Sequence, residues 1–319
     1  MRDLVSRYRI AIGLVLIVVV AGLTSWYVIT TARPEAGAGG QNGGVLVIDQ
    51  RAGGDAVSTL DGDPEGQRTP TGLRCQRVYS AGGTTVCLRP SGVGFEAAVL
   101  DAGGKTLRSV ALPGVPSRAR VSASGRIVSW TVFVTGDSYA APGGFSTRTG
   151  FLDLRSGTLV ESLESFSTTV DGAPHDAVDE NFWGLTVAAD DTTFYATLGT
   201  GGRRWLVKGD LSARTVATVR PGPECPSLSP DGTKVAYKKA GRWVGRWELA
   251  VLDLAAGKET VLPKTEGIDD QAAWLDDSTL AYGAPSSSTG VPSVFRVAAD
   301  GSSDPVLLAK DASSPVPAG

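Results

Sequence analysis

The chain has 319 residues, of which 42% are hydrophobic and 20% charged, a balance typical of folded proteins rather than disordered ones. Its formal net charge of -3 provides no basic surface for a polyanion, which excludes nucleic acid as a main partner. One histidine and three cysteines, without a short-spaced cluster, exclude a typical zinc site, and we expect no metal and no cofactor.

The first element is a long apolar segment near the N-terminus. Residues 10–30 contain no charged residue, and twenty residues of helix cross about 30 Å, the thickness of the hydrocarbon core of a bilayer. The arginines of residues 1–9 precede this segment, and only Arg33 follows it closely. The positive-inside rule therefore predicts a single transmembrane helix in the cell membrane, with a cytoplasmic N-terminus and the rest of the chain outside the cytoplasm.

A cleavable signal peptide is the alternative to this anchor. Ala36-Gly37-Ala38 fits a small-residue cleavage site, and cleavage near Ala38 would give a secreted protein. The apolar run is longer than the roughly 7–15 residues of a signal peptide, which favours an uncleaved anchor. Residues 31–44 are rich in Gly and Ala, and they predict a flexible tether between the anchor and the following domain.

From residue 45 onward the sequence repeats two kinds of hairpin. In the first kind, two apolar strands flank a turn of Gly, Asp or Ser, residues that supply the positive φ or the side-chain hydrogen bonds of tight turns. Its copies begin at Arg77, Arg120, Leu185, Pro226 and Ala272. The second kind follows each copy, over residues 96–113, 149–164, 205–219, 248–263 and 293–309, and one further member, 45–60, precedes the first pair.

Four strands per unit, with a spacing of about 40 to 60 residues between units, is the pattern of a β-propeller blade. The unpaired N-terminal hairpin can complete the last blade, which closes the ring and covers strand edges that would otherwise pair with other chains. The C-terminal tail, residues 311–319, has room for at most one short strand. We therefore predict an all-β, six-bladed propeller over residues 45–310 with one blade incomplete, and five blades as the competing number.

The clearest copy of the repeat reads LSPDGTKVAYKK followed by WELAVLDLAAGKETVLP. It resembles the WD40-like PD40 repeat of TolB-type propellers. The pattern covers nearly all of residues 45–310, and the match is close over residues 227–263. The resemblance implies a six-bladed TolB-like fold on the outer face of a bacterial membrane, in a family whose propellers commonly bind proteins. It identifies no binding residue, because PD40 is a turn-and-strand motif.

The cysteines suggest one disulfide. Cys75 and Cys87 are equally distant from Ala81, in the expected turn of the first hairpin, so they should face each other across an antiparallel pair. An oxidising compartment outside the cytoplasm favours a bond between them, and two buried thiols are the alternative. Cys225 occupies the repeat position of Cys75 but stands opposite Tyr237, so we expect a free buried thiol.

The longest polar connection between predicted strands, residues 171–181, is a candidate binding loop. It gathers His175, Asp176, Asp179 and Glu180. Binding residues collect on long loops of rigid scaffolds, and a histidine beside a carboxylate suits general-base chemistry. The alternative is a solvated polar loop, which is the usual state of a single exposed histidine.

Two further groups are candidates. Glu224, Asp269 and Asp270 precede strands that should line the central channel, where converging carboxylates hold a cation in sugar-lactonase-like propellers. The alternative is that they merely hydrate a wide channel. Trp243 and Trp247, each preceded by an arginine, form a basic-aromatic hairpin edge that suits either an interaction patch or packing.

The sequence contains no catalytic constellation. There is no G-x-S-x-G elbow, and a single histidine is available to serve any nucleophile. We therefore expect a non-enzymatic scaffold of the cell envelope whose propeller binds a protein or a cell-wall component, with the loops 135–150 and 171–181 as the first regions to test. A metal-dependent hydrolase that uses the channel carboxylates is the alternative function.

Overall fold

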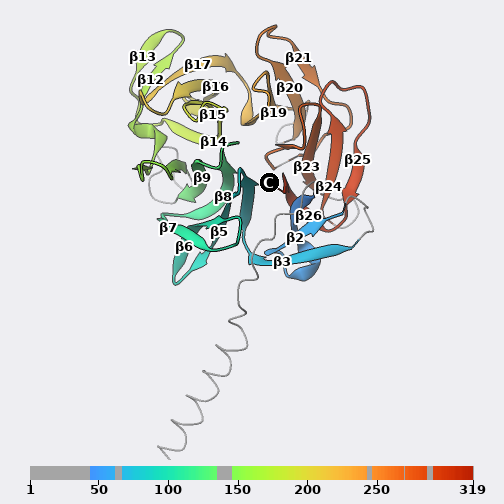
Figure 1. The fold of residues 1–319 in the computed structure, drawn as a ribbon. Helices are drawn as coiled ribbons and strands as arrows, with labels where there is room; N and C mark the ends of the chain where they lie inside the picture. Colours follow the sequence, from blue (N-terminus) through green and yellow to red (C-terminus); the bar gives the residue numbers. More distant parts are fainter. Residues whose placement is uncertain are drawn as a thin grey trace, which may run out of the picture. The chain divides into compact units, whose positions relative to one another are not determined.

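The computed structural model describes residues 44–61, 67–134, 146–242, 246–268, 270–285 and 290–318. In these ranges the chain consists of β-strands and two short 3-10 helices, η1 (Gln50–Ala52) and η2 (Leu163–Ser165). The strands form six separate sheets arranged around a common axis (Figure 1). The fold is an all-β, six-bladed propeller, so the predicted number of blades is confirmed and the alternative of five is wrong.

Each blade begins with its innermost strand, next to the axis, and continues outward. Blade 1 contains β26 (Ala312–Pro317), β1 (Val45–Asp49), β2 (Ala56–Leu60) and β3 (Arg68–Arg74). Blade 2 contains β4 (Arg77–Ala81), β5 (Thr84–Ser91), β6 (Gly94–Asp101) and β7 (Thr106–Leu112). Blade 3 contains β8 (Val115–Val121), β9 (Ile127–Val134), β10 (Ser146–Asp153) and β11 (Leu159–Val160).

The second half of the ring continues in the same order. Blade 4 contains β14 (Asn181–Val187), β15 (Thr193–Thr200), β16 (Arg203–Asp210) and β17 (Thr215–Pro221), followed by β12 (Ser167–Val170) and β13 (Ala173–His175). Blade 5 contains β18 (Glu224–Leu228), β19 (Lys234–Ala240), β20 (Trp247–Asp253) and β21 (Glu259–Val261). Blade 6 contains β22 (Ala273–Trp274), β23 (Thr279–Pro285), β24 (Pro292–Ala298) and β25 (Val306–Ala309).

The ring closes through blade 1, which is complete. The C-terminal strand β26 pairs with β1, so one strand from the C-terminus joins three from the N-terminal part of the chain. The predicted incomplete blade is therefore wrong, and the propeller extends to Pro317 rather than to residue 310. The repeat pattern missed β3 because its sequence, RTPTGLR, contains Pro70 and Gly72 and lacks apolar alternation.

Blade 4 carries an extra hairpin at its outer edge. The strands β12 and β13 pair in antiparallel fashion around the turn Asp171-Gly172, and β12 pairs with β17 in parallel. Part of the segment predicted as a polar loop, residues 171–181, therefore belongs to a strand. The sequences STTV and APH are too short to show apolar alternation, so they give no strand signal of their own.

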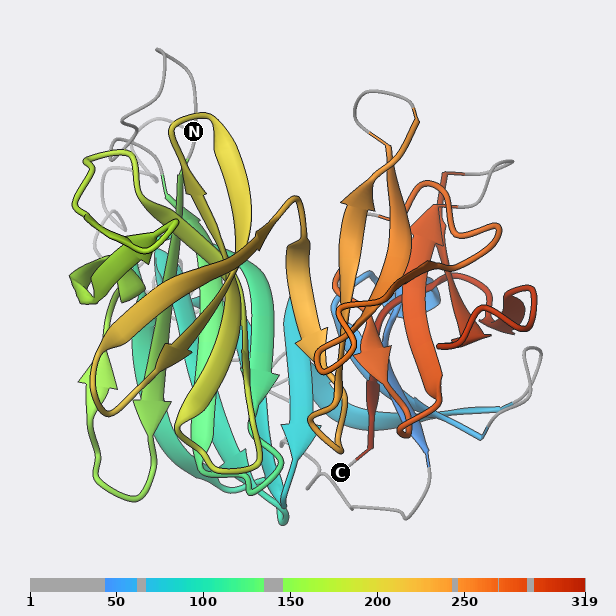
Figure 2. The same ribbon diagram turned by 90° about the horizontal axis from the view of Figure 1, so that it is seen from above.

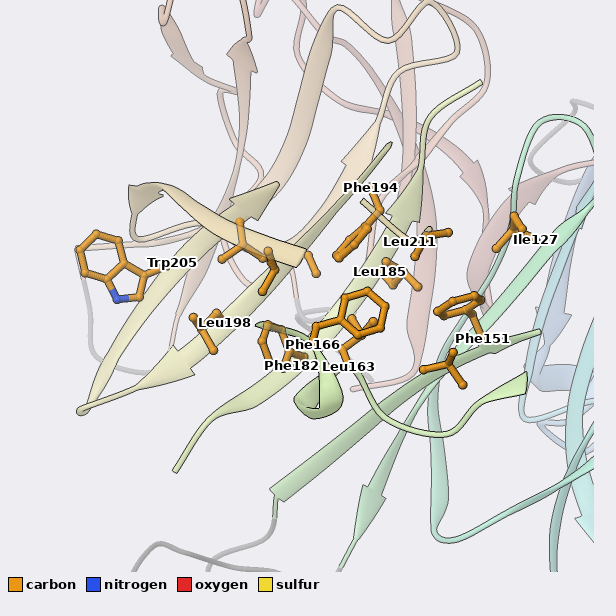
Figure 3. Packing of buried hydrophobic residues seen from close by; sticks show 14 residues of the cluster. Ile127, Phe151, Leu163, Phe166, Phe182, Leu185, Phe194, Leu198, Trp205 and Leu211 are labelled. Carbon is orange, nitrogen blue, oxygen red and sulfur yellow. The ribbon is translucent and has the colours of Figure 1, made fainter. Parts of the chain in front are cut away.

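The hydrophobic core is divided among the blade interfaces. Six buried clusters each combine residues of two neighbouring blades, so every blade is apolar on both faces. The largest lies between blades 3 and 4, where the ring of Phe166 is edge-on to Phe151 (6.4 Å between centroids) and to Phe194 (6.0 Å) (Figure 3). Burial of apolar area at about 25 cal/mol per Å² makes these interfaces the main source of stability.

The connections between strands define two faces of the disc. Because successive strands run in opposite directions, the turns between second and third strands and the links between blades lie on one face, which we call the upper face. The turns between first and second strands lie on the other, the lower face. The amide of Ala318 donates to the carbonyl of Gly44 (2.8 Å), so both ends of the described propeller lie on the lower face, opposite the turn Gly201–Gly202 (Figure 2).

Several predictions fall on residues outside the described ranges. They include the transmembrane helix 10–30, the tether up to residue 43, Trp243, Asp269 and most of the loop 135–150. Among the described residues, no helix has the length and apolar character needed to cross a membrane.

A disulfide joins Cys75 and Cys87, whose Cα atoms are 5.3 Å apart. The geometry on which we based this pairing is nevertheless wrong. The hairpin turns at Gly82-Gly83, and Val78 rather than Cys75 stands opposite Cys87. Cys75 lies in the link from blade 1 to blade 2, where its amide donates to the carbonyl of Asp55 (2.7 Å). The disulfide thus connects this link to the second strand of blade 2, and Cys225 is a free, buried thiol.

Candidate functional site

The first predicted group, His175, Asp179 and Glu180, comes together at the upper end of β15. The hydroxyl of Thr200 donates to Oδ1 of Asp179 (2.8 Å), and the amide of Gly201 donates to Oδ2 (2.7 Å). These two hydrogen bonds lower the pKa of Asp179. Nε2 of His175 lies 2.9 Å from the Thr200 hydroxyl. The Thr200 hydroxyl donates its proton to Asp179 and not to His175. The imidazole therefore does not act as a base that activates this hydroxyl as a nucleophile.

Glu180 is the buried member of this group. The hydroxyl of Thr168 donates to its Oε2 (2.9 Å), whereas its Oε1 is buried without a hydrogen bond, 3.9 Å from Nε2 of His175. Burial raises the pKa of Glu180, because the loss of solvent around the carboxylate outweighs the hydrogen bond from Thr168. The group fastens the β12–β13 hairpin to the blade. Asp176 lies exposed beside it.

The second group joins Glu224 to Trp247, which the sequence suggested for different reasons. The indole N–H of Trp247 donates to Oε1 of Glu224 (3.1 Å), and Nε of Arg204 lies 3.3 Å from the same oxygen. The ammonium of Lys238 lies over the Trp247 ring, 4.2 Å from its centroid. Glu224 is buried, so this network links blades 4 and 5 rather than presenting a carboxylate to the channel.

The third group surrounds a small cavity on the propeller axis, of about 20 Å³. Its walls come from the innermost strands β4, β8 and β26 and from the residues before β22. The polar side chains that line it are Arg77, Tyr79, Arg118, Arg120, Asp270, Gln271 and Ser314.

Asp270 is the carboxylate of this axial cavity. The hydroxyl of Ser314 donates to its Oδ2 (2.7 Å), and Nη1 of Arg118 lies 3.6 Å from its Oδ1. Burial alone would raise the pKa of Asp270. The charges of Arg118 and Arg77 and the hydrogen bonds outweigh burial and hold the pKa at about 2, so Asp270 is ionised at neutral pH.

Arg120 closes the channel at this level. Its Nη2 donates to Oγ of Ser227 (3.0 Å) in blade 5 and to the carbonyl of Ala272 (2.6 Å) beside blade 6. Its guanidinium also lies over the ring of Tyr79 in blade 2, 4.6 Å from the centroid. The channel is therefore occupied at this level by side chains, in contrast to the wide hydrated channel that we considered.

Among the described residues, the candidate channel carboxylates Glu224 and Asp270 have separate partners. Glu224 pairs with Arg204 and Trp247, whereas Asp270 pairs with Arg118 and Ser314. Within the described ranges there is no group of three or more His, Cys, Asp or Glu side chains that suits a metal ion. The three arginines of the cavity were not predicted, although an arginine within an apolar innermost strand, as in SRARV, is a usable signal.

Exposed apolar side chains accompany these groups on the upper face. Val93 and Val178 lie in upper-face turns with relative exposures of 112% and 78%. Val115 and Phe133, which are cross-strand partners at the upper ends of β8 and β9, are 50% and 37% exposed. The other exposed large apolar residues of the described chain lie on outer strands. Val93, Val115, Phe133 and Val178 therefore each expose apolar surface on the upper face.

No protein-family profile matches the sequence, and no curated protein matches it either. Among solved structures, the chain is similar to TolB from Acinetobacter baumannii, with a TM-score of 0.62, 16% identity and coverage of 87% of this chain and 67% of that one. It is also similar to a chain of a nidogen/laminin complex, with a TM-score of 0.54, 11% identity and coverage of 86% and 97%. At these identities the likeness establishes the fold, a TolB-like six-bladed propeller.

Proposed function

We propose that this protein is a non-enzymatic scaffold whose upper face binds a protein partner outside the cytoplasm. The observation that carries the proposal is the position of Val93, Val115, Phe133 and Val178, which expose apolar surface on the face opposite the ends of the described propeller. Truncation of a few central apolar or aromatic side chains removes most of the affinity of a typical interface.

The predicted anchor and tether suit a binding role. If residues 10–30 span the membrane, the Gly- and Ala-rich tether lets the propeller search the space beside the bilayer for a partner. The positive-inside distribution of arginines supports a location of the propeller outside the cytoplasm.

The solved structures with a similar fold are consistent with a binding role. One neighbour comes from a complex between nidogen and laminin, and TolB is similar to this chain over 87% of the chain's length. Because function resides in sites rather than in folds, these likenesses support the proposal only as analogy.

The proposal is tested by capture of partners from the native envelope. The full-length chain is purified in detergent, immobilised and exposed to solubilised envelope, and retained proteins are identified by mass spectrometry. The upper-face variant F133S/V178S is compared with V261S/V306S, which alters two exposed valines of outer strands. We expect a retained protein whose recovery falls by about tenfold with the upper-face variant, equivalent to about 1.4 kcal/mol, and is unchanged with the control.

Two results would contradict the proposal. One is equal recovery with the upper-face variant and the wild-type chain. The other is retention of cell-wall polymer without any specific protein, which would show that the propeller binds the cell wall instead.

A further inference from the structure

The described lining of the axial cavity carries more positive than negative charge. Among the described residues that line it, Arg77, Arg118 and Arg120 supply three positive charges, and Asp270 supplies one negative charge. The charges of Arg118 and Arg77 hold the pKa of Asp270 at about 2, so its carboxylate is ionised beside them.

Arg120 has hydrogen-bonding capacity that the protein does not use. It is 6% exposed, its two hydrogen-bond acceptors are neutral, and its Nε is buried without a partner. A buried charged donor without an acceptor is costly, so such an atom indicates a missing group.

The cavity is reachable and small. The side chains of Arg118 and Asp270 are 13% and 18% exposed, so the cavity has an opening to solvent. The cavity begins at the upper end of the innermost strands, where Arg77 begins β4 and Asp270 precedes β22, and it extends to Arg120 and Val316 near the lower ends of β8 and β26. A cavity of about 20 Å³ exceeds the roughly 10–15 Å³ that holds one water, and it is too small for a sugar ring.

We propose that the axial cavity receives a carboxylate of the polypeptide that docks on the upper face, either an acidic side chain or a C-terminal carboxylate. This inference rests on the proposed function and names the chemistry that the partner presents. Guanidinium groups bind planar carboxylates through paired charge-assisted hydrogen bonds, which suits a site lined by three arginines. The apolar surface of the upper face supplies contact area, and the cavity fixes the register of the partner.

The first test uses acetate as the probe. Thermal unfolding of the full-length chain is followed in sodium acetate and in sodium chloride at equal ionic strength and neutral pH. Binding to the folded state alone raises the melting temperature. We expect acetate to raise it by at least about 2 °C more than chloride does, for the wild-type chain and for the control R203Q, but not for R118Q. Arg203 begins β16, where its guanidinium lies over Trp205, outside the cavity.

The same variants are then used in envelope capture. Recovery of the partner should fall by about tenfold with R118Q and stay unchanged with R203Q. The substitution R118Q could also disturb the packing around the propeller axis. R77Q therefore serves as a second variant, for which we expect the same loss of recovery. It must unfold cooperatively near the melting temperature of the wild-type chain.

The outcomes separate the two proposals. If acetate and chloride raise the melting temperature equally, the cavity binds small anions without a preference for carboxylates. That result would overturn the carboxylate inference. A partner captured equally by the wild-type chain, R118Q and R77Q would also overturn it, while leaving the proposed function intact. Acetate-specific stabilisation without any captured protein would support the cavity's preference for carboxylates and contradict the proposed function.

Discussion

Arg120 connects four blades through one side chain. It extends from β8 to acceptors in blade 5 and beside blade 6, and it lies over Tyr79 of blade 2. Hydrogen bonds to charged groups contribute about 1.5–3 kcal/mol each, so we expect R120M to lower the free energy of unfolding by about 2–4 kcal/mol. The control R203M alters an exposed arginine and should change it by less than about 0.5 kcal/mol. Urea unfolding measures both, and similar losses for the two variants would contradict this role.

Glu180 predicts a pH dependence of stability. Burial raises its pKa in the folded state, so the folded chain holds this proton more tightly than the unfolded chain. The resulting stabilisation is present below the ordinary pKa of glutamate and is lost as pH rises through the folded-state pKa. We therefore expect E180Q to melt at a higher temperature than the wild-type chain at pH 7, and the difference to shrink towards about pH 4.

The melting temperatures of the wild-type chain and of E180Q, compared across this range of pH, give the difference. A variant E180Q that is less stable than the wild-type chain at pH 7 would show that the ionised carboxylate is stabilised, for example by His175.

At the scale of elements, tight turns of neighbouring blades touch on the lower face. Gly82 has a φ of +55°, and a Cβ on it would lie 2.4 Å from the amide nitrogen of Gly125 in the next blade. Gly201 has nearly the same φ, +57°, with nothing within 4 Å of its Cβ position. G201A should therefore lower the free energy of unfolding by about 1–2 kcal/mol, the cost of a positive φ for alanine. G82A should lower it by about 1–3 kcal/mol more, because the backbone of Gly125 must move away from the added methyl group.

This pair of variants isolates contact between blades from backbone strain, since the two glycines share a conformation. Chemical unfolding of both variants gives the comparison. Equal losses would mean that the turns of blades 2 and 3 do not constrain each other.

Hairpins with regular alternation were predictable, and irregular edge strands were not. The copy at Pro226 signals both strands through apolar alternation around the turn Asp231-Gly232. The strands β3, β12 and β13 gave no signal because RTPTGLR contains a proline and a glycine, and because STTV and APH are too short to show apolar alternation. His175, Asp179 and Glu180 lie close together because they are neighbours in the chain, so their proximity needs no knowledge of the fold.

The axial cavity could not be predicted from local sequence. Arg120 meets Ser227 and Ala272 only because six blades bring β8, β18 and the segment before β22 around one axis. Such contacts depend on the number of blades and on the approach of distant strands. For the same reason Glu224 was assigned to the channel, although Trp247 and Arg204 hold it between blades.

For the whole molecule, closure of the ring depends on β26. Val316 is 4% exposed and packs in the cluster of Leu46 and Ile48, between blades 1 and 2. An uncompensated buried charge costs about 3–5 kcal/mol, so V316D should lower the free energy of unfolding by that amount and broaden the transition. V306D, at a valine that is 51% exposed, should change it by less than about 0.5 kcal/mol. Equal stability of the two variants in urea would contradict closure by β26.

The central claim is that the upper face receives the partner, and site-specific photocrosslinking in native cells tests it most directly. A photoreactive residue is placed at Val93 or Val178 on the upper face, and at Ala213 or Ala256 in exposed turns of the lower face. We expect a crosslinked protein adduct from both upper positions and none from the lower ones. Adducts from the lower positions alone, or with equal yield from both faces, would contradict the claim.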